Sequence, residues 1–245
     1  MLNCDITKIM FLDIETVPLK SNFDELPDNM ACLWKEKFVS LQKYWSEKDS
    51  ENTTPEEAFS NNGGIYAEFG KIVCISVGFI YYRNDNMFFR TKSFAGDDET
   101  LILQNFAQLI KDNWTTREHF FCGHNIKEFD IPYICRRMII NNITIPAVLN
   151  VGGKKPWETA FLDTLELWKF GDKKSYTSLK LLTAVLGIPT PKDDIDGSQV
   201  AQVYYQEKDV KRIAAYCQKD VLATAQVFLR LNQLETIKEC NIEHL

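Results

Sequence analysis

The feature that most constrains the fold is an apolar run near the start of the chain that ends in two acidic residues. Residues 8–14 read KIMFLDI, and apolar, aromatic-rich runs of this length are typical of strands. Asp13 and Glu15 lie two positions apart, so on a continuing strand their side chains share one face. Two adjacent carboxylates suit a hard divalent cation. Taken alone, the pair is better explained by acidic residues that leave a core strand for solvent.

The remaining patterns indicate a mixed α/β fold. Residues 71–81 and 87–94 are predicted to be the two strands of a hairpin, joined by a polar turn at 83–86. A short strand is expected at 119–122, and helices at 98–112, 132–140, 178–186, 198–205 and 208–234, with Ser178 and Ser198 as caps. Strands lead and helices dominate the second half. The expected fold class is therefore α/β, with a mixed central sheet that contains an antiparallel hairpin and is flanked by helices.

Length and composition fit one domain. A chain of 245 residues with 45% hydrophobic content can bury a substantial core, so residues 1–245 are expected to form a single domain. Residues 20–64 mix acidic, asparagine and aromatic residues, which predicts a long surface insertion packed through Trp34, Phe38, Tyr44 and Trp45. The irregular segments 150–157 and 187–198 are predicted to border a substrate cleft.

Apolar runs, cysteines and charge exclude several classes of protein. No apolar run approaches the roughly 18–20 residues of a membrane span, and the N-terminus lacks the features of a signal peptide, so we expect no membrane partner and a cytoplasmic protein. Seven cysteines without a CxxC pair predict neither a disulfide framework nor a zinc cluster. A net charge of −6 argues against gripping long nucleic acid by charge alone, but not against an enzyme whose bound metals supply positive charge locally.

A second polar cluster lies between the strand at 119–122 and the helix at 132–140. It reads GHNIKEFDIPY, from Gly123 to Tyr133. Asp130 taken alone is explained as a helix cap. Its neighbours weaken that explanation, because Asn125 and Phe129 accompany it at the carboxyl end of a strand, where α/β folds tend to place sites.

A third cluster lies inside the last long helix. Tyr216 and Asp220 are four positions apart and share one face, at the edge of the apolar stripe that runs through Ile213, Cys217 and Val221. Acidic residues rarely occupy such an edge without a partner. Asp220 is therefore either part of a site or paired with a basic residue of a neighbouring helix.

Together the clusters supply four carboxylates, enough to hold two magnesium ions that activate water and stabilise a departing oxygen. FLDIET, GHNIKEFDIPY and YCQKD resemble, in order and rough separation, the three exonuclease motifs of the DEDD superfamily. Tyr-x3-Asp in the third motif resembles the DEDDy branch, whereas the DEDDh branch has His-x4-Asp. The middle motif resembles the proofreading domains of family B DNA polymerases, and much of the chain is similar to the bacterial stand-alone group related to them.

This resemblance implies a ribonuclease H-like fold and a 3′–5′ exonuclease that releases nucleoside 5′-monophosphates. It implies two divalent cations, Mg²⁺ with Mn²⁺ able to substitute, and a water oriented by Tyr216. The implied metal ligands are Asp13, Glu15, Asp130 and Asp220. Thr16, Asn125 and Phe129 are the expected substrate contacts, although core packing explains Phe129 equally well.

Two further residues are weighed against the same resemblance. His124 lies inside the second motif but is not expected to be a catalytic base, since the family accepts other residues at that position. Asp163 is expected either to cap a helix or to support the site from behind.

Three functions stay open at this stage. The first is an exonuclease on the 3′ end of nucleic acid, with single-stranded DNA as the expected partner; a polymerase or repair partner is not identified. The second keeps the site but trims RNA. The third is a non-catalytic domain that binds nucleic acid or protein, which the negative charge and the aromatic insertion favour and the intact carboxylates oppose.

Overall fold

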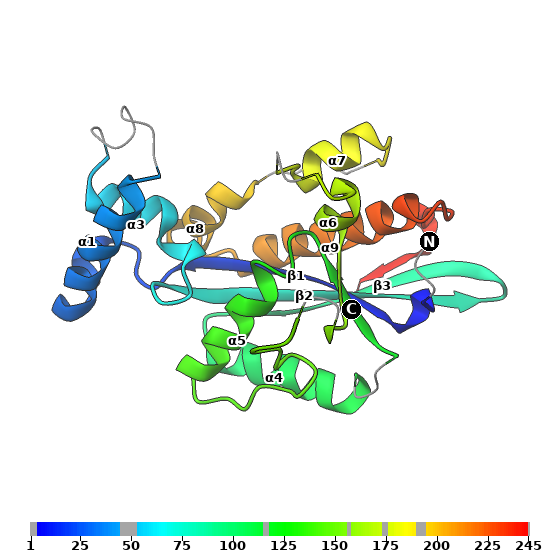
Figure 1. Ribbon diagram of the computed structural model, residues 1–245, viewed down its shortest axis with the longest axis horizontal. Helices are drawn as coiled ribbons and strands as arrows, with labels where there is room; N and C mark the ends of the chain where they lie inside the picture. Colours follow the sequence, from blue (N-terminus) through cyan, green and yellow to red (C-terminus); the bar gives the residue numbers. More distant parts are fainter. Residues whose placement is uncertain are drawn as a thin grey trace.

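A six-stranded mixed sheet forms the centre of the molecule, with the spatial order β5-β4-β1-β2-β3-β6. The computed structural model describes residues 4–44, 53–114, 118–155, 158–172, 176–189 and 195–244. The strands are β1 (Ile9–Pro18), β2 (Gly70–Arg83), β3 (Asn86–Ala95), β4 (Phe120–Gly123), β5 (Phe161–Asp163) and β6 (Ile242–His244). Figure 1 shows helices on both faces of this sheet. The α/β class and the sheet expected of a ribonuclease H-like exonuclease are confirmed.

Strand directions follow from the turns and crossovers that join the strands. β1 pairs antiparallel with β2 and parallel with β4, and β4 pairs parallel with β5. The hairpin of β2 and β3 is confirmed, and its turn places Asn84 and Asp85 at φ 50° and 60°, the left-handed conformation that suits a two-residue hairpin loop. The parallel edge strand β6 was not predicted, because a strand of three residues carries too little pattern.

The helices form one layer on each face of the sheet. α4 (Glu99–Asn113) and α5 (Asp130–Ile140) cover one face, and α9 (Val210–Leu231) covers the other, where α6 (Thr164–Lys169) and α7 (Leu179–Val185) contact it. No helix in the described part of the chain is both long and apolar enough to cross a membrane.

Alternation along β1 decides which way its acidic residues face. Met10 and Leu12 pack in the hydrophobic cluster shared with α4 and α5, whereas Ile9 and Phe11 pack with α9. Asp13 and Glu15 continue the second set, because successive strand side chains point to opposite faces. Both carboxylates therefore lie on the α9 side of the sheet.

One predicted helix start is wrong. Ser178 caps α7 as expected, accepting a hydrogen bond from the Leu181 amide at 3.2 Å. Ser198 does not cap a helix. Asp196, two residues before it, forms a capping box with Gln199 and is the N-cap of a short 3₁₀ turn at Gly197–Gln199. The chain then continues as α8 (Val200–Gln202) and a π-helical turn at Val203–Glu207 before Asp209 caps α9.

The insertion at 20–64 contains α1 (Asp28–Gln42) and α3 (Pro55–Asn62), which lie beyond the far end of β1 (Figure 1). Trp34 and Phe38 are buried, as predicted, in a separate hydrophobic cluster that also contains Phe59. Tyr44 is 88% exposed, so its predicted packing is wrong: α1 ends before it. Trp45 lies outside the described residues. Whether the chain is one domain stays a prediction.

A buried ion pair joins α4, α5 and β2. Arg137 donates to the two carboxylate oxygens of Glu99 at 2.8 and 2.6 Å, and it also donates to the Ala67 carbonyl oxygen. Glu99 accepts two more hydrogen bonds, from the Ile72 amide and the Asn141 side chain. A buried carboxylate that is so fully bonded depends on its partner to remain charged.

Replacing Arg137 is therefore expected to destabilise the protein strongly. Arg137→Met leaves the Glu99 carboxylate buried without its counter-charge, which costs about 3–5 kcal/mol of unfolding free energy in urea denaturation. The matched control is Glu207→Gln, which removes the more exposed pair with Arg212 and costs less than about 1 kcal/mol. Similar losses in both variants would contradict the expectation.

Candidate active site

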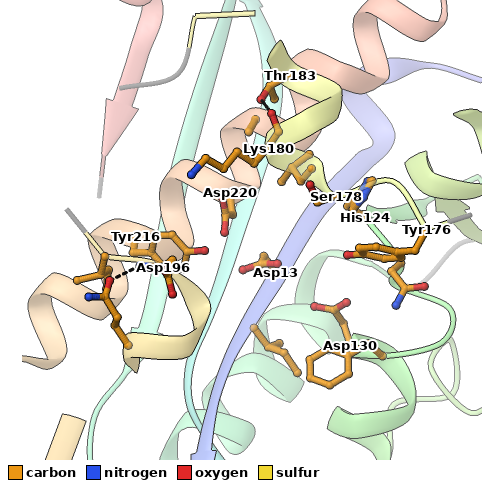
Figure 2. Close-up of a pocket in the computed structure, with 17 residues that line it drawn as sticks. Asp13, His124, Asp130, Tyr176, Ser178, Lys180, Thr183, Asp196, Tyr216 and Asp220 are labelled. Carbon is orange, nitrogen blue, oxygen red and sulfur yellow. Dashed lines mark hydrogen bonds between the residues drawn. The ribbon is translucent and has the colours of Figure 1, made fainter. Parts of the chain in front are cut away.

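A cleft of about 590 Å³ opens between β1, α5, α7 and α9. Six of the eight predicted site residues line it: Asp13, Asn125, Phe129, Asp130, Tyr216 and Asp220. Figure 2 shows the side chains of Asp13, Asp130 and Asp220 around the same space, with Tyr216 beside them. Glu15 and Thr16 are not among the lining residues.

Glu15 is on β1, two residues after Asp13, and its side chain is buried near Cys217 of α9. Ligand atoms of Asp13, Glu15 and Cys217 lie within 4.8 Å of one another. The Cys217 thiol contacts Asp13 Oδ2 and the Asp13 carbonyl oxygen, each at 3.4 Å. Glu15 is only 8% exposed, so this acidic pair does not simply leave the strand for solvent.

Burial, with mutual repulsion added to it, perturbs the acidity of these carboxylates. Burial, then the charges of Glu15, Asp130 and Asp220, hold the pKa of Asp13 well above its usual range. Burial and the charge of Asp220 do the same to the pKa of Glu15, and burial raises the pKa of Asp130 to about 7. No lysine or arginine in the described part of the chain forms a salt bridge with Asp13, Glu15 or Asp130.

Asp130 is the first residue of α5 rather than its cap. Phe129 occupies the cap position and makes no capping hydrogen bond. The Asp130 carboxylate accepts instead from its own amide and from the Ile14 amide of β1, which fixes it against the strand that carries Asp13.

Asp163 plays both of the parts expected of it. One carboxylate oxygen caps α6 at the Leu165 amide and accepts from the Asn125 amide, each at 2.9 Å. The other accepts from the Lys127 amide at 3.2 Å. These bonds hold the loop before Asp130, in which Asn125 has the left-handed φ of 68°. Asp163 therefore orders the loop without lining the cleft.

His124 has no ring nitrogen left for proton transfer. Its Nδ1 is bonded to the Thr164 hydroxyl at 2.9 Å, and its Nε2 to the Thr177 carbonyl oxygen at 2.8 Å. Because a carbonyl only accepts, Nε2 carries the proton. In the neutral ring Nδ1 then accepts from the Thr164 hydroxyl, whose other contact, to the Gly123 carbonyl oxygen, is longer at 3.3 Å. Burial lowers the pKa of His124, so the ring is neutral and joins the second motif to the segment before α7.

Tyr216 stays protonated beside the acidic residues. Burial raises the pKa of Tyr216, and the charges of Asp220 and Glu15 and a hydrogen bond to Asp220 raise it further. Spacing of four residues on α9 turns Tyr216 and Asp220 to the same wall of the cleft, as the sequence predicted.

The expected substrate contacts differ in their positions. Phe129 lines the cleft and also packs on Tyr133, with ring centroids 5.5 Å apart, so neither expectation for it is excluded. The Thr16 side chain is hydrogen-bonded to Tyr133, after a bulge that shifts the β1–β2 register between Glu15 and Thr16. Thr16 is thereby placed away from the cleft lining.

Several cleft residues were missed from sequence. Tyr176 is 64% exposed and packs edge-on against the His124 ring, and Lys180 extends from α7 toward the side on which Asp220 lies (Figure 2). The cap at Ser178 was the available signal, since it places both residues at a helix start. Ile195 and Asp196 line the cleft as expected for 187–198, of which 190–194 lie outside the described residues. The prediction that 150–157 borders this cleft is wrong for its described residues: Asn150, Val151, Gly152 and Lys154 line a different groove beside α5, and 156 and 157 lie outside the described residues.

Residues 65–241 match a family described as a predicted 3′–5′ exonuclease related to the exonuclease domain of PolB. The chain belongs to this family. The exonuclease match includes the second and third acidic clusters but begins after Asp13 and Glu15, which join the site through the pairing of β1 with β2. No curated protein matches the chain.

The donor set of this cleft fits divalent cations. Carboxylate oxygens are the ligands that hard cations prefer, and a bound cation would offset the burial that raises the pKa values of Asp13, Glu15 and Asp130 and the repulsion that raises those of Asp13 and Glu15 further.

Neutralising Asp13 is expected to stabilise the cation-free protein. A carboxyl group with a raised pKa loses its contribution to stability as pH rises through the folded-state value. Asp13→Asn should therefore exceed wild type by about 1–2 kcal/mol at about pH 8 in a chelator, and by much less at about pH 5. Mg²⁺ should raise the melting temperature of wild type more than that of the variant.

Thermal unfolding at both pH values, with and without Mg²⁺, measures these differences. The matched control is Asp24→Asn, which neutralises an exposed carboxylate on the insertion. If Asp13→Asn responds to pH and Mg²⁺ as Asp24→Asn does, the carboxylates do not repel one another as described.

Proposed function

We propose that the protein is a metal-dependent 3′–5′ exonuclease of the DEDDy type that removes nucleoside 5′-monophosphates from single-stranded DNA. The observation that carries the proposal is the convergence of acidic residues from three distant segments. Asp13 on β1, Asp130 on α5 and Asp220 on α9 line one cleft, with Glu15 buried behind them.

In this proposal Asp13, Glu15 and Asp220 would hold one divalent cation, and Asp13 with Asp130 would hold a second. When bound, such ions lower the pKa of an attacking water and stabilise the leaving oxygen of an in-line displacement. The Tyr216 hydroxyl keeps its proton, because its pKa is raised, and orients the water through a hydrogen bond. The neutral His124 ring, bonded at both nitrogens, takes no proton.

The shape of the cleft favours a single strand. A volume of about 590 Å³ is of the size that holds one small ligand, which supports one terminal nucleotide as the group bound there. Phe129 and Tyr176 offer aromatic faces that stack on any base, and Lys180 offers a positive charge for a phosphate. Asn125 supplies an amide for the terminal sugar or phosphate. Thr16, away from the lining, is the weakest of the predicted contacts.

DNA is favoured over RNA by the family, whose description refers to the exonuclease domain of PolB. The exonuclease is proposed to act in the cytoplasm on free 3′ ends, as one domain over residues 1–245. Mg²⁺ is the proposed ion, and Mn²⁺ its substitute, since both accept carboxylate oxygens.

The test is degradation of oligonucleotides labelled at either end in the presence of Mg²⁺. Mononucleotides should leave the 3′ end of single-stranded DNA first, and Asp13→Ala or Asp220→Ala should lower the rate at least ~100-fold. Unchanged release in either variant would contradict the site. Faster degradation of matched RNA would support the exoribonuclease alternative. Absence of both cleavage and calorimetric cation binding would support a non-catalytic domain.

Lys180 is expected to bind a phosphate of the strand. In a catalytically inactive Asp220→Ala background, Lys180→Met should weaken binding of a fluorescent single strand. The slope of log affinity against log salt should fall by about 0.7, the value for one phosphate contact on a single strand. Lys111→Met, an exposed lysine on α4, is the matched control. Equal slopes for the two variants, measured by anisotropy, would remove Lys180 from the strand path.

A further inference from the structure

A buried thiol lies inside the carboxylate cluster. Cys217 on α9 is fully buried, and its Sγ lies 3.4 Å from Asp13 Oδ2. A tetrahedral ion with a metal–sulfur bond of about 2.3 Å and a metal–oxygen bond of about 2.1 Å separates the two donors by roughly 3.6 Å. The donor atoms of Asp13, Glu15 and Cys217 all lie within 4.8 Å of one another, so the three can surround one ion.

The burial and the missing hydrogen-bond donors of Glu15 are a second, independent indication of a cation site. Its side chain is more than nine-tenths buried, and in the described part of the chain no group donates a hydrogen bond to its carboxylate. The groups that act on it, Asp220, Cys74 and Asp130, are all acidic. A buried carboxylate in such company gains most from a positive ion.

Sulfur changes which ions such a site prefers. Mg²⁺ takes oxygen ligands and avoids thiols, whereas thiolates select softer ions such as Zn²⁺ and Cd²⁺. We infer that Cys217 is a ligand for thiophilic divalent cations, which occupy the Asp13–Glu15 site through a sulfur bond that Mg²⁺ does not make. Binding replaces the thiol hydrogen by the metal and releases one proton to solvent. The inference rests on the proposed cation site, but not on hydrolysis.

Cys74 provides the matched control. It is buried on β2, is hydrogen-bonded to Cys217 and lies 3.5 Å from the Ser76 hydroxyl, but it is not in the group of donors around Asp13 and Glu15. Cys32 and Cys240 are exposed, so they would bind soft ions independently of the carboxylate cluster. Both are therefore replaced by serine in every protein tested.

The experiment is a Cd²⁺ titration of this background protein, followed by the ultraviolet thiolate-to-metal charge-transfer band. One equivalent of Cd²⁺ should produce the band. Cys217→Ser should abolish the band and weaken Cd²⁺ binding at least tenfold, while Mg²⁺ affinity measured by calorimetry changes less than twofold. Cys74→Ser should retain the band, and Glu15→Gln should weaken the binding of both ions.

The outcomes separate this inference from the proposed function. Stoichiometric Cd²⁺ binding without the band, or a band that survives Cys217→Ser, overturns the sulfur ligand but leaves the carboxylate site standing. Failure of both ions to bind removes the site and the inference together. If Cys217→Ser does not fold, cadmium NMR of the background protein decides: a resonance typical of sulfur coordination supports the inference, and one typical of oxygen alone overturns it.

Discussion

Repulsion among buried carboxylates is the interaction on which the rest of this structure depends. Asp13 and Glu15 are fixed by β1, and Asp130 is fixed by amides of α5 and β1, so none can move away without disturbing the sheet or the core. The folded chain must bear this cost through packing elsewhere. A bound cation would offset this cost, because affinity for a cation and destabilisation of the cation-free site have the same electrostatic origin.

The scaffold tolerates a long insertion between its first acidic pair and the remaining site. Tyr133 donates to the Gly64 carbonyl oxygen and Tyr205 to the Pro18 carbonyl oxygen, so both ends of the insertion are tied to the core. β2 then returns beside β1 and places Ser76 opposite Asp13. Loop closure costs little more for a long insertion than for a short one when its ends are held.

Periodicity and turn chemistry made β1 to β4, the hairpin and α9 predictable from sequence. The strands β5 and β6 have three residues each and were not predicted. The cap at Ser198 failed, since Asp196 accepts a hydrogen bond from the Ser198 amide and the helical turn therefore begins before Ser198. Local sequence gives no sign that the Glu15 carboxylate is buried near Cys217 of α9, or that Tyr176 and Lys180 line the cleft. The acidic residues were found because their combination suits one chemistry, whereas residues that only line or brace the cleft depend on tertiary contacts.

The weak hydrogen bond from Cys217 to Asp13 explains how a thiol can lie beside a proposed site for hard cations. A thiol is a weak hydrogen-bond donor, so Cys217 orients the Asp13 carboxylate without neutralising it as a lysine or arginine would. The oxygen thus stays available to Mg²⁺. A softer ion finds the same oxygen with a sulfur atom beside it. On this inference, the kind of donor atom beside Asp13 sets the ion selectivity of the cleft together with the number of negative charges around it.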